Sequence, residues 1–397
     1  MGERQSGVLQ IDFDALPTVF PAREVEAVLS ELERSGKRRR KLPAAATMYL
    51  IIALGLMVST GAKRVLRRLL DQVRERDWVV DAPVSSEAAI HKARRRIGYE
   101  PLELLFERTA RPLARKRTRG AWFRGRRVVT LDGSTLQVQD SPANARAFGR
   151  PATAKAPAAW PLIRFVMLAE NGTRAAFGAA MGPWRTGEAT LAREVVGLLR
   201  DGMLCLADRL FFSYALWNEA RASGADLLWR VPKNLQLPRI EVYKDRSYLS
   251  RIRPPQRGPL RRHEPVLVRV VEFTARRRDK SEHYRVITTI LDPRAASAME
   301  LAQLYARRWT IETMLLELKT YLRGSQVLLR SRVPDLVRQD FWGLMLAYFG
   351  VRSLMHEAAL EEDIEPKEIS FVHALDVIIR RLPEAVPFSP SAEAALP

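Results

Sequence analysis

Three carboxylates, far apart in the sequence, stand where metal chemistry could use them. Asp132 follows the apolar run "RRVVTL", Asp208 follows "MLCLA", and Glu312 lies in the helix-like run "YARRWTIETMLLELK". Burying acidic side chains at the ends of core strands costs free energy unless a cation binds them. Carboxylates suit Mg²⁺, and two divalent ions about 4 Å apart can activate the attacking oxygen and stabilise the leaving oxygen of a phosphodiester. The three residues therefore indicate metal-dependent phosphodiester chemistry.

The segment around Glu312 carries three more polar residues at regular spacing. Tyr305, Arg308, Glu312 and Lys319 follow one another at steps of three, four and seven residues. On an α-helix, at about 100° per residue, these side chains would lie within about 60° of one another. The simpler interpretation is a solvated helix face with a weak ion pair between Arg308 and Glu312. The coincidence of this polar face with the other carboxylates favours a functional interpretation.

Each aspartate also has an ordinary explanation when it is considered alone. Asp132 lies in "LDGS", and Asp-Gly is a common turn pair. Asp208 precedes "FFSYALWNE", where it could cap a helix. For either aspartate alone, the turn or cap explanation is better than a functional one. When both aspartates are considered together with the polar face around Glu312, the functional explanation is better.

The elements that must position these residues fall into three predicted regions. Residues 1–120 consist of helix-like segments and predict a separate helical domain. Residues 121–330 alternate strands with helices, which predicts an α/β sheet, and "LIRFVMLAENGTRAAFGAAMGP" predicts a hairpin closed at Asn171-Gly172. A segment at about 233–282, rich in Pro and Arg, predicts a β-rich insertion. Residues 331–397 are again helical.

A basic helix end in the first region is a candidate DNA contact. "SSEAAIHKARRRIG" predicts a helix capped by Ser85 or Ser86 that ends in Arg94, Arg95 and Arg96. Such an end could enter a DNA groove. It could equally be a solvated helix end whose charge complements the helix dipole.

The charge balance predicts a polyanionic partner. Lys plus Arg total 65 against 45 Asp plus Glu, a formal net charge of +20. Basic runs recur along the chain, and arginine binds phosphate with two parallel hydrogen bonds. Nucleic acid is therefore the expected partner, although a high net charge also keeps a protein soluble.

The remaining composition excludes several classes of protein. The single cysteine, Cys205, lies in an apolar run, so neither a disulfide nor a cysteine-based metal site is available, and a cytoplasmic location is expected. The apolar run at 48–58 is shorter than the roughly 20 residues needed to cross a bilayer and predicts a buried helix. The five histidines have no metal-ligand spacing, and no phosphate-binding loop occurs. Trp229, beside the insertion, is a candidate for stacking on an unpaired base, with core packing as the alternative.

The chain resembles a known family, the DDE transposases of the insertion sequence four group. "YARRWTIETMLLELK" matches the Tyr-Arg-Glu-Lys signature, YxxRxxxExxxxxxK, at all four positions, and "LDGS" and "LADRLFF" precede it in the family's order. The resemblance extends over nearly the whole chain, including the helical region that ends in a KARRRIG-like segment. One departure is the tail "PFSPSAEAALP", which is acidic and apolar where a basic extension is expected.

The resemblance implies a fold, an activity and a set of site residues. The fold would be an α/β ribonuclease-H-like catalytic core with a β-rich insertion, preceded by a helical DNA-binding domain. Asp132, Asp208 and Glu312 would hold two divalent ions, Mg²⁺ or Mn²⁺, and catalyse cleavage and strand transfer. The expected DNA contacts, near the cut element end or on the helical domain, are Tyr305, Arg308, Lys319, Arg94, Arg95 and Arg96.

The expected partners are double-stranded DNA, at the terminal inverted repeats and the target, and a second copy of the chain when two ends are paired. No membrane is expected, and the location would be the cytoplasm with its nucleoid. Two alternatives stay open: a non-catalytic DNA-binding relic, and a metal-dependent nuclease without strand transfer.

Overall fold

The computed structural model describes residues 18–35, 42–57, 60–67, 86–151, 160–277, 280–321 and 329–381. Within these ranges, the side chains of residues 276–277, 280, 309–312, 320–321 and 381 lie outside the description. The chain forms two compact units, which we describe separately. Unit 1 comprises residues 1–113 and 318–397, and unit 2 comprises residues 114–317.

Unit 1 is helical. Its described α-helices are α2 (Ala22–Glu31), α3 (Ala44–Leu56), α5 (Glu87–Ile97), α6 (Glu100–Thr109), α12 (Pro334–Glu361) and α13 (Phe371–Arg381). All residues of α3 except Ala45 and Leu54 are buried, which is typical of a helix that is apolar on every side. The apolar run near residue 50 is therefore a buried helix, as the sequence predicts, and no described helix is long and apolar enough to cross a membrane.

Helices from distant parts of the sequence, α3 and α12, pack together in unit 1. Helix α3 lies against α12, and their glycines allow a close approach: a Cβ built on Gly55 would lie 2.5 Å from the carbonyl oxygen of Gly343. The sequence pattern predicts separate regions at 1–120 and 331–397, whereas in the structure their described helices share one core. The physical reason is that α3 has no polar face and needs cover on all sides. The assignment of functional domain boundaries stays a prediction.

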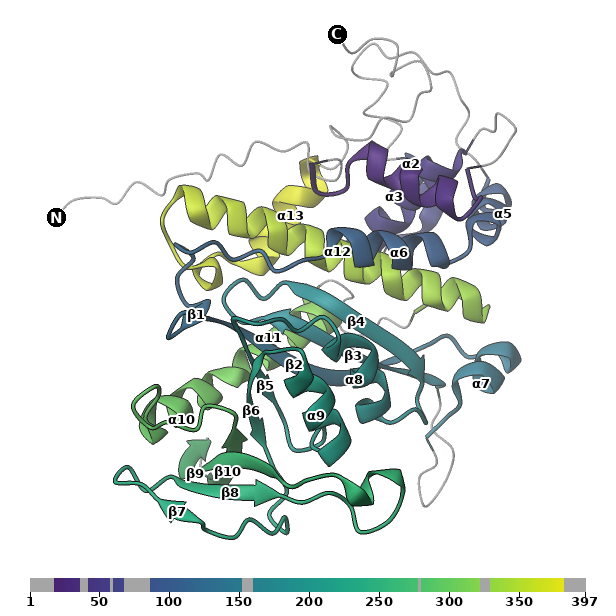
Figure 1. Cartoon of the computed structure of the whole chain (residues 1–397). Coiled ribbons are helices and arrows are strands. Elements are labelled where there is room, and N and C mark those ends of the chain that lie inside the picture. The colour runs from purple at the N-terminus through teal and green to yellow at the C-terminus, as the bar shows by residue number, and fades with distance from the viewer. Residues whose placement is uncertain are drawn as a thin grey trace, which may run out of the picture. The chain divides into compact units, whose positions relative to one another are not determined.

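Within the part of unit 2 that the structure describes, ten strands form one mixed sheet. The strand order is β4-β3-β2-β5-β6-β10-β9-β8-β7, and β1 pairs with β2 outside this path (Figure 1). The strands are β1 (Trp122–Phe123), β2 (Arg126–Gln137), β3 (Leu162–Glu170), β4 (Ala176–Pro183), β5 (Met203–Ala207), β6 (Asp226–Arg230), β7 (Glu241–Val242), β8 (Tyr248–Ile252), β9 (Val266–Arg277) and β10 (Lys280–Thr288). Strand β5 pairs in parallel with β2 on one side and with β6 on the other, and all other described strand pairs are antiparallel.

Helices cover both faces of this sheet. Helices α8 (Glu188–Val196) and α9 (Tyr214–Ala222) pack on one face, in a core that includes Val129 and Leu131 of β2. Helix α10 (Ala298–Ala306) packs on the other face, in a core that includes Val128. Successive side chains of a strand point to opposite faces, so β2 contributes to both cores through its buried residues 128–131.

Two sequence predictions about unit 2 can be compared directly with the sheet. The predicted hairpin is present: β3 and β4 are antiparallel, and residues 171–175 connect them. The predicted insertion is β-rich, but it is not a separate body. Its strands continue the same sheet, because β10 pairs antiparallel with β6 and then with β9.

Candidate active site

Asp132 lies where the parallel pairing of β2 ends. The last parallel pair is Leu131 with Ala207, whereas the antiparallel pairing with β3 continues to Gln137. The sequence predicted that Asp132 ends its strand or forms a turn, and both predictions are wrong. The strand continues because β3 supplies a hydrogen-bonding partner on the other side. Asp132 nevertheless stands at the carboxyl end of the parallel part of the sheet.

The Asp132 carboxylate is largely buried and has two described polar contacts. Its Oδ1 accepts a hydrogen bond of 2.8 Å from the Gly133 amide, and its Oδ2 lies 3.4 Å from Nη1 of Arg308. Burial raises the pKa of Asp132, while the Arg308 charge and the Gly133 amide lower it and the nearby Asp208 and Glu188 raise it further. The net direction of the pKa shift is upward, and burial is its largest cause.

Asp208 immediately follows β5, as the sequence predicts. Its Oδ1 is buried and makes no hydrogen bond with the described residues, although Nη1 of Arg230 lies 3.8 Å away. A buried carboxylate oxygen without a hydrogen-bond donor is unusual, because buried polar atoms are normally paired. The site therefore has an acceptor that a cation could meet.

Arg230 is a site residue that the sequence analysis missed. It is the last residue of β6, it is buried, and its guanidinium pairs with Glu282 and lies 4.3 Å from the centre of the Tyr284 ring. The Tyr284 hydroxyl in turn donates to Glu282 at 2.8 Å. The available signal was its place at the carboxyl end of "DLLWR", the strand parallel to the one that precedes Asp208.

Tyr305 and Arg308 reach the aspartates from α10 and the 3-10 turn η2 (Arg307–Trp309) that follows it. The Tyr305 hydroxyl donates a 3.2 Å hydrogen bond to the carbonyl of Ala207, directly before Asp208. Tyr305 is only 2% exposed, and burial raises its pKa well above the ordinary value, so it remains a neutral donor. The Arg308 guanidinium lies 5.7 Å from the Tyr305 ring and contacts Asp132. Both residues thus support the aspartates from one side.

Glu312 and Lys319 lie in a segment that is not one regular helix. After η2, Glu312 belongs to α11 (Thr310–Leu316), and Lys319 to the π-helical turn η3 (Glu317–Tyr321). The backbone of Glu312 is described, but its side chain lies outside the described part. The uniform spacing of about 100° per residue does not hold across these turns, because 3-10 and π turns wind more tightly and more loosely. The single polar face expected from Tyr305 to Lys319 is therefore not present in its ideal form.

Glu188 is a second residue that the sequence analysis missed. It opens α8, and a Cβ built on Gly133 would lie 3.2 Å from its Cδ atom. Its charge is one of those that raise the pKa of Asp132. The local signal was weak, because an acidic residue in the first turn of a helix is ordinary.

The three arginines expected to contact DNA have different surroundings in unit 1. They end α5, whose cap is Ser86, the second of the two expected candidates. Arg94 pairs with Asp340 and donates to Gln339 at 2.8 Å, and Arg96 donates to the carbonyl of Leu42 at 3.0 Å. Among the three, Arg95 alone is exposed. Arg94 and Arg96 therefore hold unit 1 together through contacts within it.

Other candidates lie away from the aspartates. Trp229 is completely buried in the sheet core against Trp217, so the base-stacking role considered for it is wrong.

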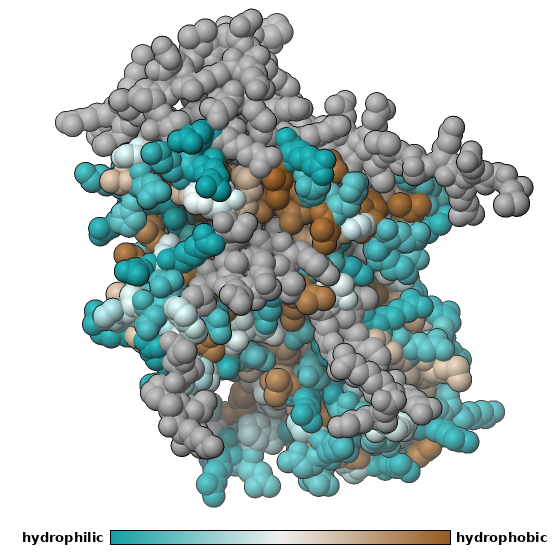
Figure 2. All heavy atoms as spheres, turned by 180° about the vertical axis from the view of Figure 1, so that it is seen from behind, coloured by the Kyte–Doolittle hydropathy of each residue, from teal (hydrophilic) through white to brown (hydrophobic). Residues whose placement is uncertain are grey.

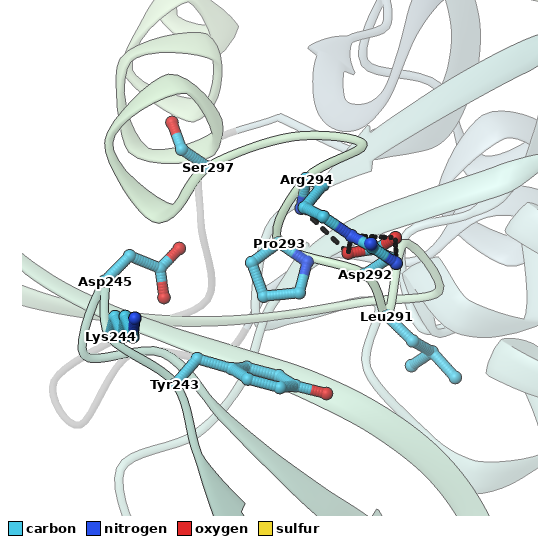
Figure 3. Close-up of a pocket in the computed structure, with 8 residues that line it drawn as sticks. All are labelled: Tyr243, Lys244, Asp245, Leu291, Asp292, Pro293, Arg294 and Ser297. Carbon is cyan, nitrogen blue, oxygen red and sulfur yellow. Dashed lines mark hydrogen bonds and ion pairs between the residues drawn. The ribbon is translucent and has the colours of Figure 1, made fainter.

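The pocket in Figure 3 lies at the β7–β8 turn and the loop before α10, and its lining includes Tyr243, Asp245 and Arg294. Among the side chains that the structure describes, no group of three His, Cys, Asp or Glu residues could hold a metal ion. The predicted third ligand, Glu312, is not among those side chains.

Comparisons with known proteins agree on one family. Residues 10–107 match the family model "Insertion element 4 transposase N-terminal", and residues 123–349 match "Transposase DDE domain". The chain is 27% identical over 353 residues to the transposase InsG for insertion sequence element IS4 of Escherichia coli K12, covering 87% of this chain and 77% of that protein. It is 26% identical over 226 residues to the putative transposase InsZ of the same organism, covering 56% and 73%.

A solved structure supports the fold. The piggyBac transposase synaptic complex with hairpin DNA matches with a TM-score of 0.52 and 13% identity, covering 100% of this chain and 85% of that chain. At this identity the likeness concerns the fold alone. Together with the strand order and the matched DDE domain, it confirms the expected ribonuclease-H-like core with its β-rich insertion and a preceding helical region.

Proposed function

We propose that this chain, which belongs to the insertion element 4 family of DDE transposases, cuts the 3′ strands at the ends of its element and joins them to target DNA with divalent metal ions. The observation that carries this proposal is the meeting of Asp132 and Asp208 at the carboxyl end of the parallel strands. The signature segment approaches the same place, where Arg308 contacts Asp132 and Tyr305 contacts the backbone before Asp208.

The residues present fit a divalent ion. Asp208 offers a buried oxygen that no described donor satisfies. Burial, together with the smaller effects of the Asp208 and Glu188 charges, raises the pKa of Asp132. We assign Asp132, Asp208 and Glu312 as the ligands. When bound there, two Mg²⁺ or Mn²⁺ ions would supply activation of the attacking oxygen and stabilisation of the leaving oxygen.

The chain's own residues orient the site and balance its charge. Arg308 and Arg230 place positive charge beside Asp132 and Asp208, which offsets part of the negative charge gathered there. Tyr305 holds the strand end before Asp208 in place by its hydrogen bond to Ala207. This support role explains the burial of Tyr305 better than the direct phosphate contact expected from the signature. Phosphate contacts by Arg308 and Lys319 remain part of the proposal.

DNA binding follows from the charge of the chain. A net charge of +20 predicts counterion release on contact with phosphates, and hydrophilic residues cover most of the described surface on the face shown in Figure 2. We propose that unit 1 binds the terminal inverted repeats, with Arg95 as its exposed arginine on α5. Pairing of two ends requires two copies of the chain, so a homodimer on DNA is part of the proposal, and the reaction takes place at bacterial DNA in the cytoplasm.

The decisive experiment compares two substitutions in the signature. Glu312→Gln keeps the size of the side chain but removes the charge a metal ion needs, so Mg²⁺-dependent nicking of a labelled terminal repeat should be lost while binding persists. Lys319→Ala should instead weaken capture of the cut end and lower the salt slope of binding by about one. Nicking by Glu312→Gln at the parental rate would refute the metal assignment.

The same assay separates the alternatives. A nuclease without strand transfer would cut the labelled end but yield no product joined to target DNA. A relic would bind the end and leave it intact at every Mg²⁺ concentration. Joined product that depends on Asp132, Asp208 and Glu312 would exclude both.

A further inference from the structure

The turn between β3 and β4 is firmly held in unit 2. Glu170, at the end of β3, is fully buried, accepts hydrogen bonds from the Ala114 amide at 2.8 Å and the Thr173 hydroxyl at 2.6 Å, and pairs with Arg127. Gly172 packs so closely that an added Cβ would lie 2.5 Å from the Cβ of Ala121. This turn is therefore a fixed point from which a neighbouring element can be held.

Arg174 extends from this turn to the signature segment. Its backbone adopts a left-handed conformation with φ of 58°, which is unfavourable for a residue other than glycine. Its Nη1 lies 2.9 Å from Oε1 of Glu317, and the two side chains are 16% and 4% exposed. An ion pair this well buried is sensitive to loss of either partner, because the remaining charge is left in a poorly hydrated place.

Glu317 stands at the point where the signature segment changes its winding. It is the first residue of the π turn η3 and lies about one and a half turns after Glu312. Helix α11, which carries Glu312, spans only Thr310–Leu316 and follows the 3-10 turn η2. A helix this short between two irregular turns has few regular backbone hydrogen bonds to fix its rotation. An external contact must therefore contribute to that rotation.

The start of α10, the helix that leads into the signature segment, is anchored by a separate charged group. Arg269, completely buried, donates to Asp245 at 2.7 Å and to the carbonyl of Ala296 at 2.6 Å. Asp245 also accepts from the Ala298 amide at 2.8 Å, in the first turn of α10, and Figure 3 shows it near Ser297. With the start of α10 fixed in this way, the signature segment that follows it has its second anchor at Glu317.

We propose that the Arg174–Glu317 pair is a positioning device that sets the rotation of α11 and so the aim of Glu312 at the metal site. This inference rests on the function proposed above. Glu317 is not itself assigned as a ligand, because its carboxylate is occupied by Arg174. The pair gives a role to the arginine in a strained turn and to the second, buried glutamate of the signature segment.

The test measures metal binding directly, apart from cleavage. Mn²⁺ affinity of the full chain is determined by electron paramagnetic resonance for Arg174→Met, Glu317→Gln and the exchanged double variant Arg174→Glu/Glu317→Arg. Loss of a group that orients a ligand should weaken Mn²⁺ binding about tenfold or more. The exchanged pair should recover part of that loss. The matched control is Arg294→Met, which removes an exposed ion pair with Asp292 and should leave Mn²⁺ affinity unchanged.

The outcomes distinguish this inference from the proposed function. Glu312→Gln is measured alongside: weak Mn²⁺ binding there with parental binding in Glu317→Gln would overturn the positioning role alone. Parental binding in Glu312→Gln would overturn the metal assignment. Thermal unfolding in EDTA identifies variants that do not fold. If both single variants fail to fold, Glu317→Asp decides. It keeps the charge but shortens the side chain by one methylene, so the 2.9 Å contact with Arg174 is either lost or turns α11, and parental Mn²⁺ affinity would then refute the inference.

Discussion

The close contact between α3 and α12 makes a specific prediction about stability. A Cβ on Gly343 would lie 2.7 Å from Cγ2 of Ile51 and 3.0 Å from its carbonyl oxygen. The carbonyl is backbone, so Gly343→Ala must push the helices apart. Overpacking costs about 1–3 kcal/mol, and the upper end applies to a backbone obstacle. Alanine regains up to about 1 kcal/mol of helix propensity, so we expect a net loss of about 2 kcal/mol.

Hydrogen exchange of the full chain measures this loss in the right place. A loss of about 2 kcal/mol should accelerate exchange of the protected amides of α3 and α12 about 30-fold, since 1.4 kcal/mol corresponds to tenfold. Amides of β5, in unit 2, serve as an internal reference. Gly61→Ala is the matched control in unit 1, because a Cβ there would meet no described atom within 4 Å. Parental exchange rates in Gly343→Ala would refute the described contact between the helices.

Three further predictions concern DNA binding and pH. Arg94→Ala should destabilise unit 1 by about 1–3 kcal/mol, because Gln339 and Asp340 each lose one hydrogen-bond partner in a poorly hydrated place. Arg95→Ala should leave unfolding unchanged and reduce the salt slope of DNA binding by about one, and equal unfolding of the two variants would contradict this. Affinity of the whole chain for the element end should fall about a thousandfold or more between 50 and 200 mM salt, and a flat response measured by filter binding would reject the electrostatic account. Burial disfavours ionised Asp245, but hydrogen bonds from Ser247 and the Ala298 amide and the charge of Arg269 outweigh it and lower its pKa. The contribution of ionised Asp245 to folding stability should therefore be present above about pH 4 and be lost as pH falls through the folded pKa. Asp245→Asn should abolish that part of the acid dependence of unfolding.

Much of the site could be predicted because its signals are local. Asp208 follows a short apolar strand, and the hairpin carries an Asn-Gly turn. Both patterns depend on residues within a few positions of each other, so the sequence contains the information. The family signature added the order of the three carboxylates, which no local pattern provides.

The remaining features depend on contacts between distant segments. The continuation of β2 beyond Asp132 depends on its partner β3, and the burial of Arg230 depends on Glu282 and Tyr284, some fifty residues later. The irregular winding near Glu312 likewise contradicts the ideal helical spacing. Helical periodicity describes an isolated helix, and it carries no information about a partner that is supplied by another strand or turn.

The continuous sheet of unit 2 has a mechanical consequence for the insertion. Strand β10 is joined to β6 through the pairs Val286–Arg230, Ile287–Trp229 and Thr288–Leu228, and its whole length pairs with β9. A hinge at the root of the insertion would have to break this ladder beside Arg230. The insertion therefore cannot swing like a lid on a flexible tether. Any force that DNA exerts on β8 and β9 is transmitted through β10 to β6. The last residue of β6 is Arg230, which lies beside Asp208.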